Sequence, residues 1–203
     1  SQTNTCPQCA IPMHLFDGHG QMITSDDTEV VDLVIIALKK GKIVAVKGVG
    51  GYLLLCDAAN TETIKLLRKR KHRPAKPFAL LYKDIDMALQ DVILSAEEQN
   101  ALEENSAPIV LCKVDRNING LSLHEIAPGL SRIGIMLPYS GLLLLITERF
   151  GKPLIATSGN ISGSPIIFRD AEALKWLCGV ADMILTFDRE IVTPQDDSVI
   201  QYT

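Results

Sequence analysis

Positive charge in this sequence is concentrated in one short run. Residues 65–76 include seven of the 20 lysines and arginines, and without those seven the net charge of −4 becomes −11. Lys71 and Arg73 fall where a predicted helix gives way to a proline-stiffened loop, so they can be held at the edge of a sheet. An arginine offers a planar fork to phosphate oxygens, and a lysine offers a compact charge. The run indicates an anion site, although taken alone it also fits a solvated helix face.

Small hydroxyl and amide residues follow a predicted buried strand. Thr157, Ser158 and Asn160 stand beside two glycines in the segment TSGNISGSP. The backbone N–H groups and hydroxyls of such a loop can surround an anion, and loops at sheet ends are where α/β proteins bind ligands. An ordinary Ser/Gly turn that caps the next helix is the alternative.

Two further segments contain residues that suit a nucleotide. KGVGGYLLLCD, residues 47–57, places a glycine-rich turn between two strands, where the backbone can come close to a ligand. It lacks the following helix of a dinucleotide-binding fingerprint, and a plain hairpin is the simpler interpretation. DREIVTPQDDSV, residues 188–199, brings Arg189, Asp197 and Ser198 ahead of a terminal strand. Its carboxylates suit a metal–phosphate or ribose contact, and an exposed acidic turn is an equal alternative.

The five cysteines fall into two groups. Cys6 and Cys9 have the ligand spacing of structural zinc but supply two of the four ligands that such a site needs. We expect the other pair upstream of this chain, with His14 and His19 as a less fitting alternative. The other three lie in apolar segments and are expected to be core thiols, because an odd count does not fit a disulfide framework: Cys56, Cys112 and Cys178.

Apolar periodicity places these segments on alternating helices and strands. Asn60 is expected to cap the helix that leads into the basic run, Ser95 with Glu98 forms a capping box, and Asp170 is expected to cap the last helix. Helices are predicted at residues 27–40, 61–70, 96–104, 141–150 and 171–178. Strands are predicted at 42–47, 52–56, 78–82, 108–114, 134–138, 152–156, 182–187 and 198–202. The alternation predicts an α/β fold, one twisted mixed sheet flanked by helices.

Composition divides the chain into two parts. Residues 1–24 lack apolar periodicity and are interpreted as a metal knuckle or tail, whereas residues 25–203 are long enough to form one domain with its own core. No apolar run reaches the roughly 18 residues of a membrane span and no signal peptide is present, so we expect a cytoplasmic protein without membrane contact. The start at Ser1 suggests an excised fragment. A net charge of −4 argues against general nucleic-acid binding.

In order and spacing, these motifs resemble the YrdC-like domain of the HypF carbamoyltransferases of nickel-iron hydrogenase maturation. The resemblance covers residues 25–203 and rests on KGVGGYLLLCD, KHRPAKPFALL, SRIGIMLPYS, ATSGNISGSPI and DREI with DDSV. The KxR and SxN signatures of the wider YrdC superfamily are present as Lys71 with Arg73 and Ser158 with Asn160. CPQC followed by PMHLFDGHG looks like the end of the zinc-finger region that precedes this domain in the family.

The sequence departs from the HypF pattern at three places. SGLLL stands where the family has a Thr-Pro-Leu-His-His stretch. Pro194 replaces an arginine shortly before DDSV, and Phe187 replaces a histidine ahead of Asp188 and Arg189. Any role of those histidines is therefore absent here.

The resemblance implies a fold with a concave basic cavity and an adenylate-forming carbamoyltransferase domain that uses ATP with Mg²⁺. Carbamate, released from carbamoyl phosphate by another domain, reacts with ATP to give carbamoyl-adenylate and pyrophosphate. The implied catalytic residues are Lys71 and Arg73, which contact the phosphates and the carbamate. Thr157 and Ser158 are implied to contact phosphate oxygens, and Asn160 is implied to have an orienting role. The further nucleotide-binding residues are Arg189, Asp197 and Ser198.

The implied partners are the adjoining domains of a longer protein and a hydrogenase maturation protein. Two other functions fit the same motifs. One is a stand-alone YrdC-type enzyme that makes threonylcarbamoyl-AMP for tRNA modification. The other is a non-enzymatic module that binds nucleotides or double-stranded RNA in the same basic cavity.

Overall fold

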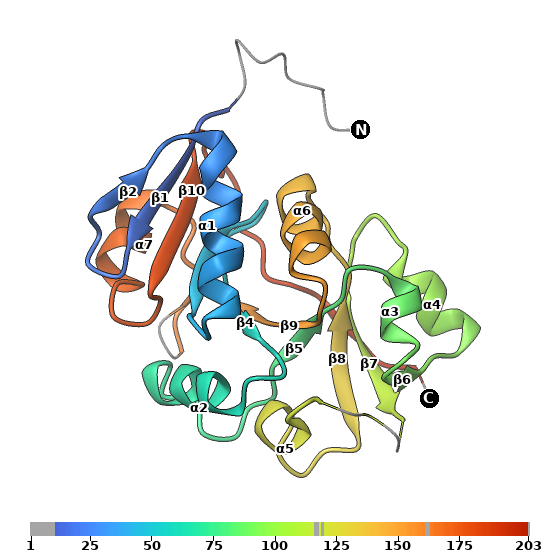
Figure 1. The fold of residues 1–203 in the computed structure, drawn as a ribbon. Helices are drawn as coiled ribbons and strands as arrows, with labels where there is room; N and C mark the ends of the chain where they lie inside the picture. The colour runs from blue at the N-terminus through green and yellow to red at the C-terminus, as the bar shows by residue number, and fades with distance from the viewer. Residues whose placement is uncertain (1–10, 116–117, 119, 161–162, 203) are drawn as a thin grey trace.

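The computed structural model describes residues 11–202, apart from 116–117, 119, 161 and 162 (Figure 1). The strands are β1 (Met13–Asp17), β2 (Met22–Thr24), β3 (Val44–Lys47), β4 (Tyr52–Asp57), β5 (Ala79–Leu81), β6 (Val92–Ile93), β7 (Ile109–Val114), β8 (Arg132–Met136), β9 (Leu154–Ser158), β10 (Met183–Phe187) and β11 (Val199–Ile200). The helices are α1 (Asp27–Lys39), α2 (Thr61–Arg70), α3 (Ile85–Ala88), α4 (Ala96–Leu102), α5 (Leu123–Ile126), α6 (Gly141–Phe150) and α7 (Asp170–Trp176). Within this described part, no helix is long and apolar enough to cross a bilayer.

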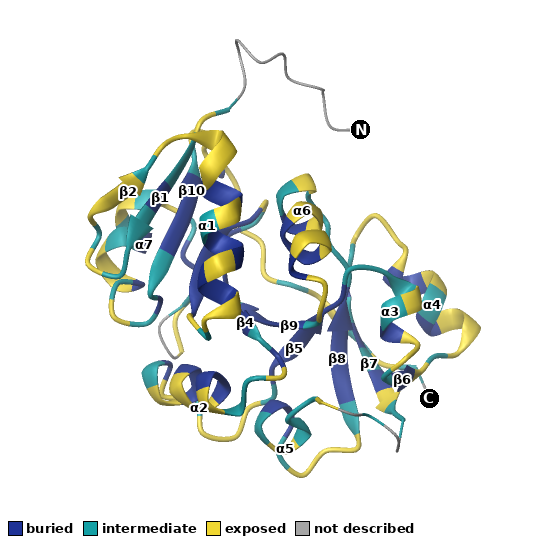
Figure 2. Ribbon diagram, in the orientation of Figure 1, coloured by how far each residue is buried: buried dark blue, intermediate teal, exposed yellow. Residues whose placement is uncertain are grey.

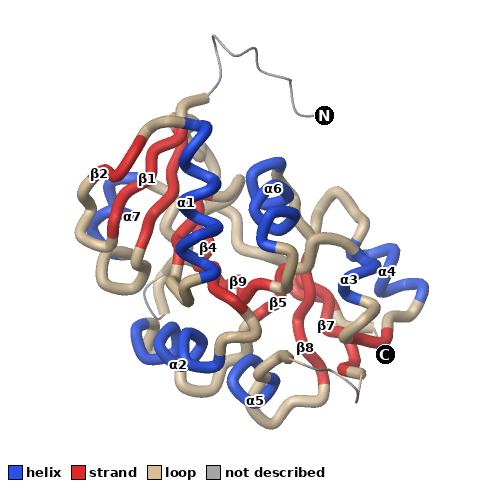
Figure 3. Tube along the Cα trace, viewed as in Figure 1, coloured by secondary structure: helices blue, strands red, loops and turns tan. Residues whose placement is uncertain are grey.

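The strands form one mixed sheet, as predicted. Its order is β11-β7-β8-β5-β9-β4-β3-β10-β1-β2, with β6 paired to β7. Three neighbouring pairs are parallel, namely β10 with β3, β11 with β7, and β5 with β8, and the other pairs are antiparallel. Figures 1 and 3 show the sheet twisting strongly between the β1–β2 end and the β7–β8 end. Because of this twist, the two edges of the sheet differ in orientation.

Each face of the sheet carries its own apolar core. Side chains alternate along a strand, so Leu53 and Leu55 of β4 pack beneath α1 and α6, while Leu54 and Cys56 face α2 and α7. The buried stretches of these strands and of the inward helix sides appear in dark blue in Figure 2. Burial on both faces explains why β3 and β4 are nearly continuous apolar runs rather than alternating ones.

Residues 13–24, which composition separates from the rest, add two strands to this same sheet. β1 pairs antiparallel with β10, with Met13 opposite Phe187, and β2 pairs with β1 (Figure 1). Leu15 is fully buried beneath α1. The cysteines of the predicted zinc pair, Cys6 and Cys9, lie outside the described residues.

The predicted elements are confirmed, within a few residues at their ends, and five short ones were missed. β1 and β2 lie in residues 1–24, interpreted as a metal knuckle or tail, and α3, β6 and α5 lie between the predicted elements. The Ser95–Glu98 capping box is present in both directions. These five missed elements are two to five residues long, too short to show a periodicity.

The predicted cap at Asp170 was wrong. Arg169 occupies the N-cap of α7 and makes no side-chain cap bond. The Asp170 carboxylate instead lies 2.7 Å from the Lys47 Nζ and accepts a 2.6 Å hydrogen bond from the Tyr52 hydroxyl. The Lys47 side chain is 2% exposed, so its ammonium would be a buried, unpaired charge without this partner. Pairing this buried ammonium stabilises the domain by more than an N-cap hydrogen bond of Asp170 would.

Candidate functional site

Lys71 joins the end of α2 to the end of β9. It is the C-cap residue of α2, whose other end is capped by the Asn60 side chain as predicted. The Lys71 Nζ donates to the Ser158 carbonyl at 2.7 Å, to Asn160 Oδ1 at 2.9 Å and to the Asn160 carbonyl at 3.3 Å. The side chain is buried. The KxR and SxN motifs are therefore in direct contact.

Arg73 follows in the loop after α2 and reaches the same strand end. Its Nη1 donates to Thr157 Oγ1 at 3.1 Å, its Nε donates to the Lys76 carbonyl at 3.2 Å, and its Nη2 donates to the Pro77 carbonyl. The guanidinium also lies over the Phe78 ring, 5.0 Å from its centroid. Because a guanidinium carries five N–H groups, these three bonds leave two for a ligand.

The Ser158–Asn160 turn is held rigidly by its neighbours. Gly159 N donates to the Tyr52 carbonyl, and a Cβ on Gly159 would lie 2.9 Å from that oxygen, so only glycine allows this approach. Ser158 Oγ donates to Asn160 Oδ1 at 3.1 Å, and Asn160 Nδ2 donates to the Ser164 carbonyl at 2.8 Å. Asn160 is thus oriented by bonds at both ends of its amide.

The two cations of the site have no carboxylate partner among the described residues. Burial, with the nearby charges of Arg73 and Lys76 as further causes, lowers the pKa of Lys71 to about 8. Burial, with the charge of Arg68 second, lowers the pKa of Arg73 to about 10. Both directions show that the charged forms are short of compensation. A bound anion would supply it.

The glycine turn between β3 and β4 connects this site to the C-terminal segment. Gly48 N bonds to the Gly51 carbonyl, and Gln195 N donates to the Gly50 carbonyl at 3.0 Å. A Cβ on Gly50 would lie 2.5 Å from the Gln195 carbonyl oxygen, and one on Gly48 would lie 2.7 Å from the Tyr139 hydroxyl. The Gly48–Gly51 turn is therefore packed closely against the Gln195 backbone and the Tyr139 hydroxyl.

A cavity of about 670 Å³ opens beside this turn. It is lined by the turn, the start of α6 and the segment after β10, and Arg189 is the predicted site residue that lines it. The Arg189 side chain is exposed. The lining residues are Ile11, Met13, Gly48, Val49, Ser140, Gly141, Leu142, Phe187, Arg189, Glu190, Ile191, Val192 and Thr193.

Asp197 and Ser198 lie farther along the same segment. Asp197 is half-buried, and burial, followed by the charge of Asp196, raises the pKa of its carboxyl. The charge of Asp197 in turn contributes, after burial, to a raised pKa of Tyr139. Ser198 offers its carbonyl to Ile109 N at 2.8 Å, which starts the pairing of β11 with β7.

Of the eight residues predicted to bind the nucleotide, five therefore contact one another, Lys71 with Ser158 and Asn160, and Arg73 with Thr157. These segments touch directly, so any ligand bound here would lie over them rather than between them. Within the described ranges no group of three His, Cys, Asp or Glu side chains is arranged to hold a metal ion.

Sequence reasoning missed residues that shape the site without carrying a motif. Tyr139 and Gln195 pack on the glycine turn, and Arg68, counted in the basic run, is buried. The Gly48–Gly51 turn was the available signal, because adjacent glycines mark close backbone approach. The residues that pack on these glycines, Tyr139 and Gln195, are more than 80 positions away in the sequence, so no local pattern identifies them.

Comparisons with known proteins bear on the fold and the family of this chain. The family model Sua5_yciO_yrdC, described as "Telomere recombination", matches residues 36–203. Carbamoyltransferase HypF from Rhodobacter capsulatus is 40% identical over 201 residues, which are 99% of this chain and 26% of that protein. A crystal structure of full-length HypF in the phosphate- and nucleotide-bound form matches with a TM-score of 0.87 and 37% identity, over 98% of this chain and 25% of that one.

A more distant relative represents the other branch. Threonylcarbamoyl-AMP synthase from Photobacterium profundum is 25% identical over 138 residues, 65% of this chain and 72% of that protein. The predicted resemblance to HypF is confirmed, and the chain spans about a quarter of those relatives. With its family model matched over residues 36–203, the chain belongs to the Sua5/YciO/YrdC family.

Proposed function

We propose that this chain is the ATP-using domain of a HypF-type carbamoyltransferase and that it joins carbamate to AMP with release of pyrophosphate. The observation that carries the proposal is the pair Lys71 and Arg73. Both are held against the hydroxyl and amide groups that end β9, and neither has a carboxylate partner in the described part of the chain. Packed cations without acids favour an anionic ligand. Similarity to a nucleotide-bound HypF supports ATP as that ligand.

The reaction needs positioning and charge rather than a protein nucleophile. A carbamate oxygen attacks the α-phosphorus in line, the bond from that phosphorus to the bridging oxygen breaks, and pyrophosphate leaves with the electron pair. The two remaining N–H groups of Arg73 would bind phosphate oxygens. Lys71 contributes charge and fixes the Ser158–Asn160 turn, because three protein oxygens already surround its Nζ.

The cysteines of the domain core fit this absence of covalent catalysis. Cys56 and Cys112 are buried as predicted, whereas Cys178, also expected in the core, is half-buried. Burial raises the pKa of the Cys112 thiol to about 12 and raises that of Cys56 as well. A thiol with so high a pKa carries almost no nucleophilic thiolate near neutral pH.

Asp196 and Asp197 would hold the Mg²⁺ that accompanies ATP. Their carboxylates are the oxygen ligands that this ion prefers. Asp197 is half-buried beside Asp196, and this proximity contributes to the raised pKa of its carboxyl. A cation would relieve that repulsion. When bound, Mg²⁺ would neutralise part of the triphosphate charge.

ATP–pyrophosphate exchange tests the proposal. Carbamate is supplied from equilibrated ammonium and bicarbonate, with ATP alone, carbamoyl phosphate and threonine as separate arms. We expect exchange that depends on carbamate and is lost in Lys71→Ala and Arg73→Ala. The matched control is Arg149→Ala, which removes an exposed arginine that pairs with Asp32 on the α1–α6 side. It should exchange like the unmodified chain.

The other outcomes select the other functions. Exchange that requires threonine would overturn the carbamate assignment in favour of threonylcarbamoyl-AMP synthesis. No exchange, together with salt-sensitive binding of double-stranded RNA, would identify a non-enzymatic module. In the proposed function, release of carbamate and transfer to a hydrogenase maturation partner belong to adjoining domains of the longer protein.

A further inference from the structure

Arg68 is a buried arginine in the basic run that does not face the site. It lies on the last turn of α2 and is 7% exposed. Its guanidinium lies 4.4 Å from the centroid of the Phe78 ring. Among the described residues, its hydrogen-bond acceptors are all main-chain carbonyls. They are Glu125 at 2.7 Å, Arg73 at 2.9 Å, Lys76 at 3.1 Å, Ile126 at 3.2 Å and Pro74 at 3.5 Å.

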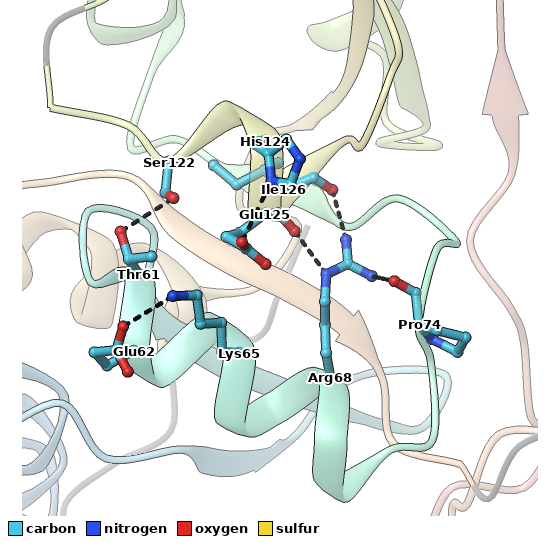
Figure 4. Close-up of polar contacts among 9 residues, drawn as sticks. All are labelled: Thr61, Glu62, Lys65, Arg68, Pro74, Ser122, His124, Glu125 and Ile126. Carbon is cyan, nitrogen blue, oxygen red and sulfur yellow. Dashed lines mark hydrogen bonds and ion pairs between the residues drawn. The ribbon is translucent and has the colours of Figure 1, made fainter.

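These carbonyls come from two segments that Arg68 holds together. Figure 4 shows the Arg68 guanidinium between the end of α5, with Glu125 and Ile126, and the loop at Pro74. The loop wraps around it, so that the loop carbonyls turn inward while the side chains of Pro74 and Lys76 stay exposed. The Arg68 guanidinium is thus the hydrogen-bond donor for the inward-facing carbonyls of this loop.

The same loop carries Arg73, and the two arginines share its groups. The Lys76 carbonyl accepts from Arg68 Nη1 and from Arg73 Nε. Both guanidinium groups lie over the Phe78 ring. The Arg73 carbonyl is itself a partner of Arg68. Where Arg73 can point is therefore set by the loop that Arg68 fixes.

We propose that Arg68 is a positioning residue: it holds the residue 73–77 loop on α5 so that Arg73 faces Thr157, and it does not touch the nucleotide itself. The inference rests on the proposed ATP site. A lysine at position 68 cannot replace this arginine. Its three N–H donors diverge from one nitrogen atom, so they cannot reach carbonyls of α5 and of the residue 73–77 loop at the same time. Arg68 and Lys71 thus differ in role although they are one helical turn apart.

A double-mutant cycle measures whether Arg68 acts through Arg73. ATP affinity is measured by calorimetry for Arg68→Lys, Arg73→Ala and the double variant. We expect Arg68→Lys to weaken binding about tenfold, the scale of a charge-assisted hydrogen bond. The double variant should bind no more weakly than Arg73→Ala alone, since the contact that Arg68 positions is already gone. Additive losses, or an unchanged affinity in Arg68→Lys, would overturn the proposal.

Arg70→Lys is the matched control. Arg70 lies on the same helix but bonds to the Val180 carbonyl and to Asp182, away from the loop. Its effect on affinity should add to that of Arg73→Ala. Failure of the unmodified chain to bind ATP would instead remove the proposed function, which is a different result from unchanged affinity in Arg68→Lys alone.

Two further measurements test the proposal even if Arg68→Lys folds poorly. In Arg68→Ala, millimolar guanidinium should restore ATP affinity and methylammonium should not, because the carbonyl cage and the Phe78 ring suit a planar cation. In the unmodified chain, the ¹⁵N–H signal of Arg68 Nε should stay in place when ATP is added, while that of Arg73 shifts. A ligand-induced shift at Arg68 as large as at Arg73 would show direct contact and contradict a positioning role.

Discussion

Lys71 and Asn160 are 89 positions apart in the sequence, yet the lysine Nζ donates to the asparagine Oδ1 at 2.9 Å. This bond joins the end of α2 to the turn after β9. Through this bond, the Lys71 ammonium of the KxR motif orients the Asn160 amide of the SxN motif. A ligand that binds here therefore meets a lysine whose charge is already partly engaged.

Proton uptake should accompany ATP binding to this lysine. Burial lowers the pKa of Lys71 to about 8, so between about pH 8 and 9 much of the free chain has a neutral amine. Phosphate charge favours the ammonium and raises that pKa, so a proton is taken up, and affinity falls as the pH rises through about 8. Calorimetry in buffers of different ionisation enthalpy gives the proton count. An equal uptake by Lys71→Ala would show that another group titrates.

Removing the carboxylate of Asp170 should destabilise the domain. Asp170→Ala leaves the buried Lys47 ammonium unpaired and the Tyr52 hydroxyl without its acceptor. We expect a loss of about 2–4 kcal/mol in the free energy of unfolding, below the full cost for a fully buried pair because Asp170 is partly exposed. Urea unfolding measures it. Glu172→Ala, which breaks an exposed pair with Arg169, should cost less than about 0.5 kcal/mol.

A methyl group at Gly50 should displace the C-terminal segment. A Cβ there would lie 2.5 Å from the Gln195 carbonyl oxygen, and backbone cannot swing aside as a side chain can. Gly50→Ala should therefore destabilise the domain by about 1–3 kcal/mol, the usual cost of overpacking. ATP affinity should fall as well, because Asp197 and Ser198 follow Gln195. Thermal unfolding and calorimetry test both effects.

Val49→Ala is the control for that variant. Val49 is 60% exposed in the same turn, so its truncation should leave stability within about 0.5 kcal/mol of the unmodified chain. Equal losses in the two variants would mean that the turn, and not the Gln195 contact, is the sensitive feature.

Local signals predicted most of the elements, and long-range pairings set the rest. The Ser95–Glu98 box and the Asn60 cap are satisfied within a few residues, so the sequence alone locates them. The partner of Asp170 is Lys47, 123 positions away, and no local pattern separates a cap from an ion pair.

The same limit applies to the site. The KxR and SxN motifs indicated which residues meet only through the resemblance to the YrdC superfamily, in which the two motifs are paired. The basic run did not show that Arg68 points inward, since its acceptors are carbonyls of α5 and of the loop, which any sequence could provide. Side-chain chemistry was readable from the sequence, whereas the course of the backbone around it was not.

The last prediction is that this chain alone forms the adenylate but does not complete carbamoyl transfer. A full reaction needs one centre to release carbamate from carbamoyl phosphate and another to pass the carbamoyl group to an acceptor. Within the described residues, no His, Cys, Asp and Glu cluster suits a second metal centre. Cys56 and Cys112 are buried, and burial raises the pKa of both thiols. The chain also spans about a quarter of its HypF relatives, which leaves room for both centres elsewhere.

With carbamoyl phosphate, ATP and the C-terminal acceptor peptide of the maturation partner, the isolated chain should leave the peptide unmodified in mass spectrometry. Carbamate from ammonium and bicarbonate should still support ATP–pyrophosphate exchange in the same preparation, which shows that the domain is active. The adenylate then has to reach its acceptor through a covalent neighbour or a tightly docked domain, because free adenylate hydrolyses in water. Carbamoylation of the peptide at a catalytic rate would contradict this division of labour and place a transfer centre within these 203 residues.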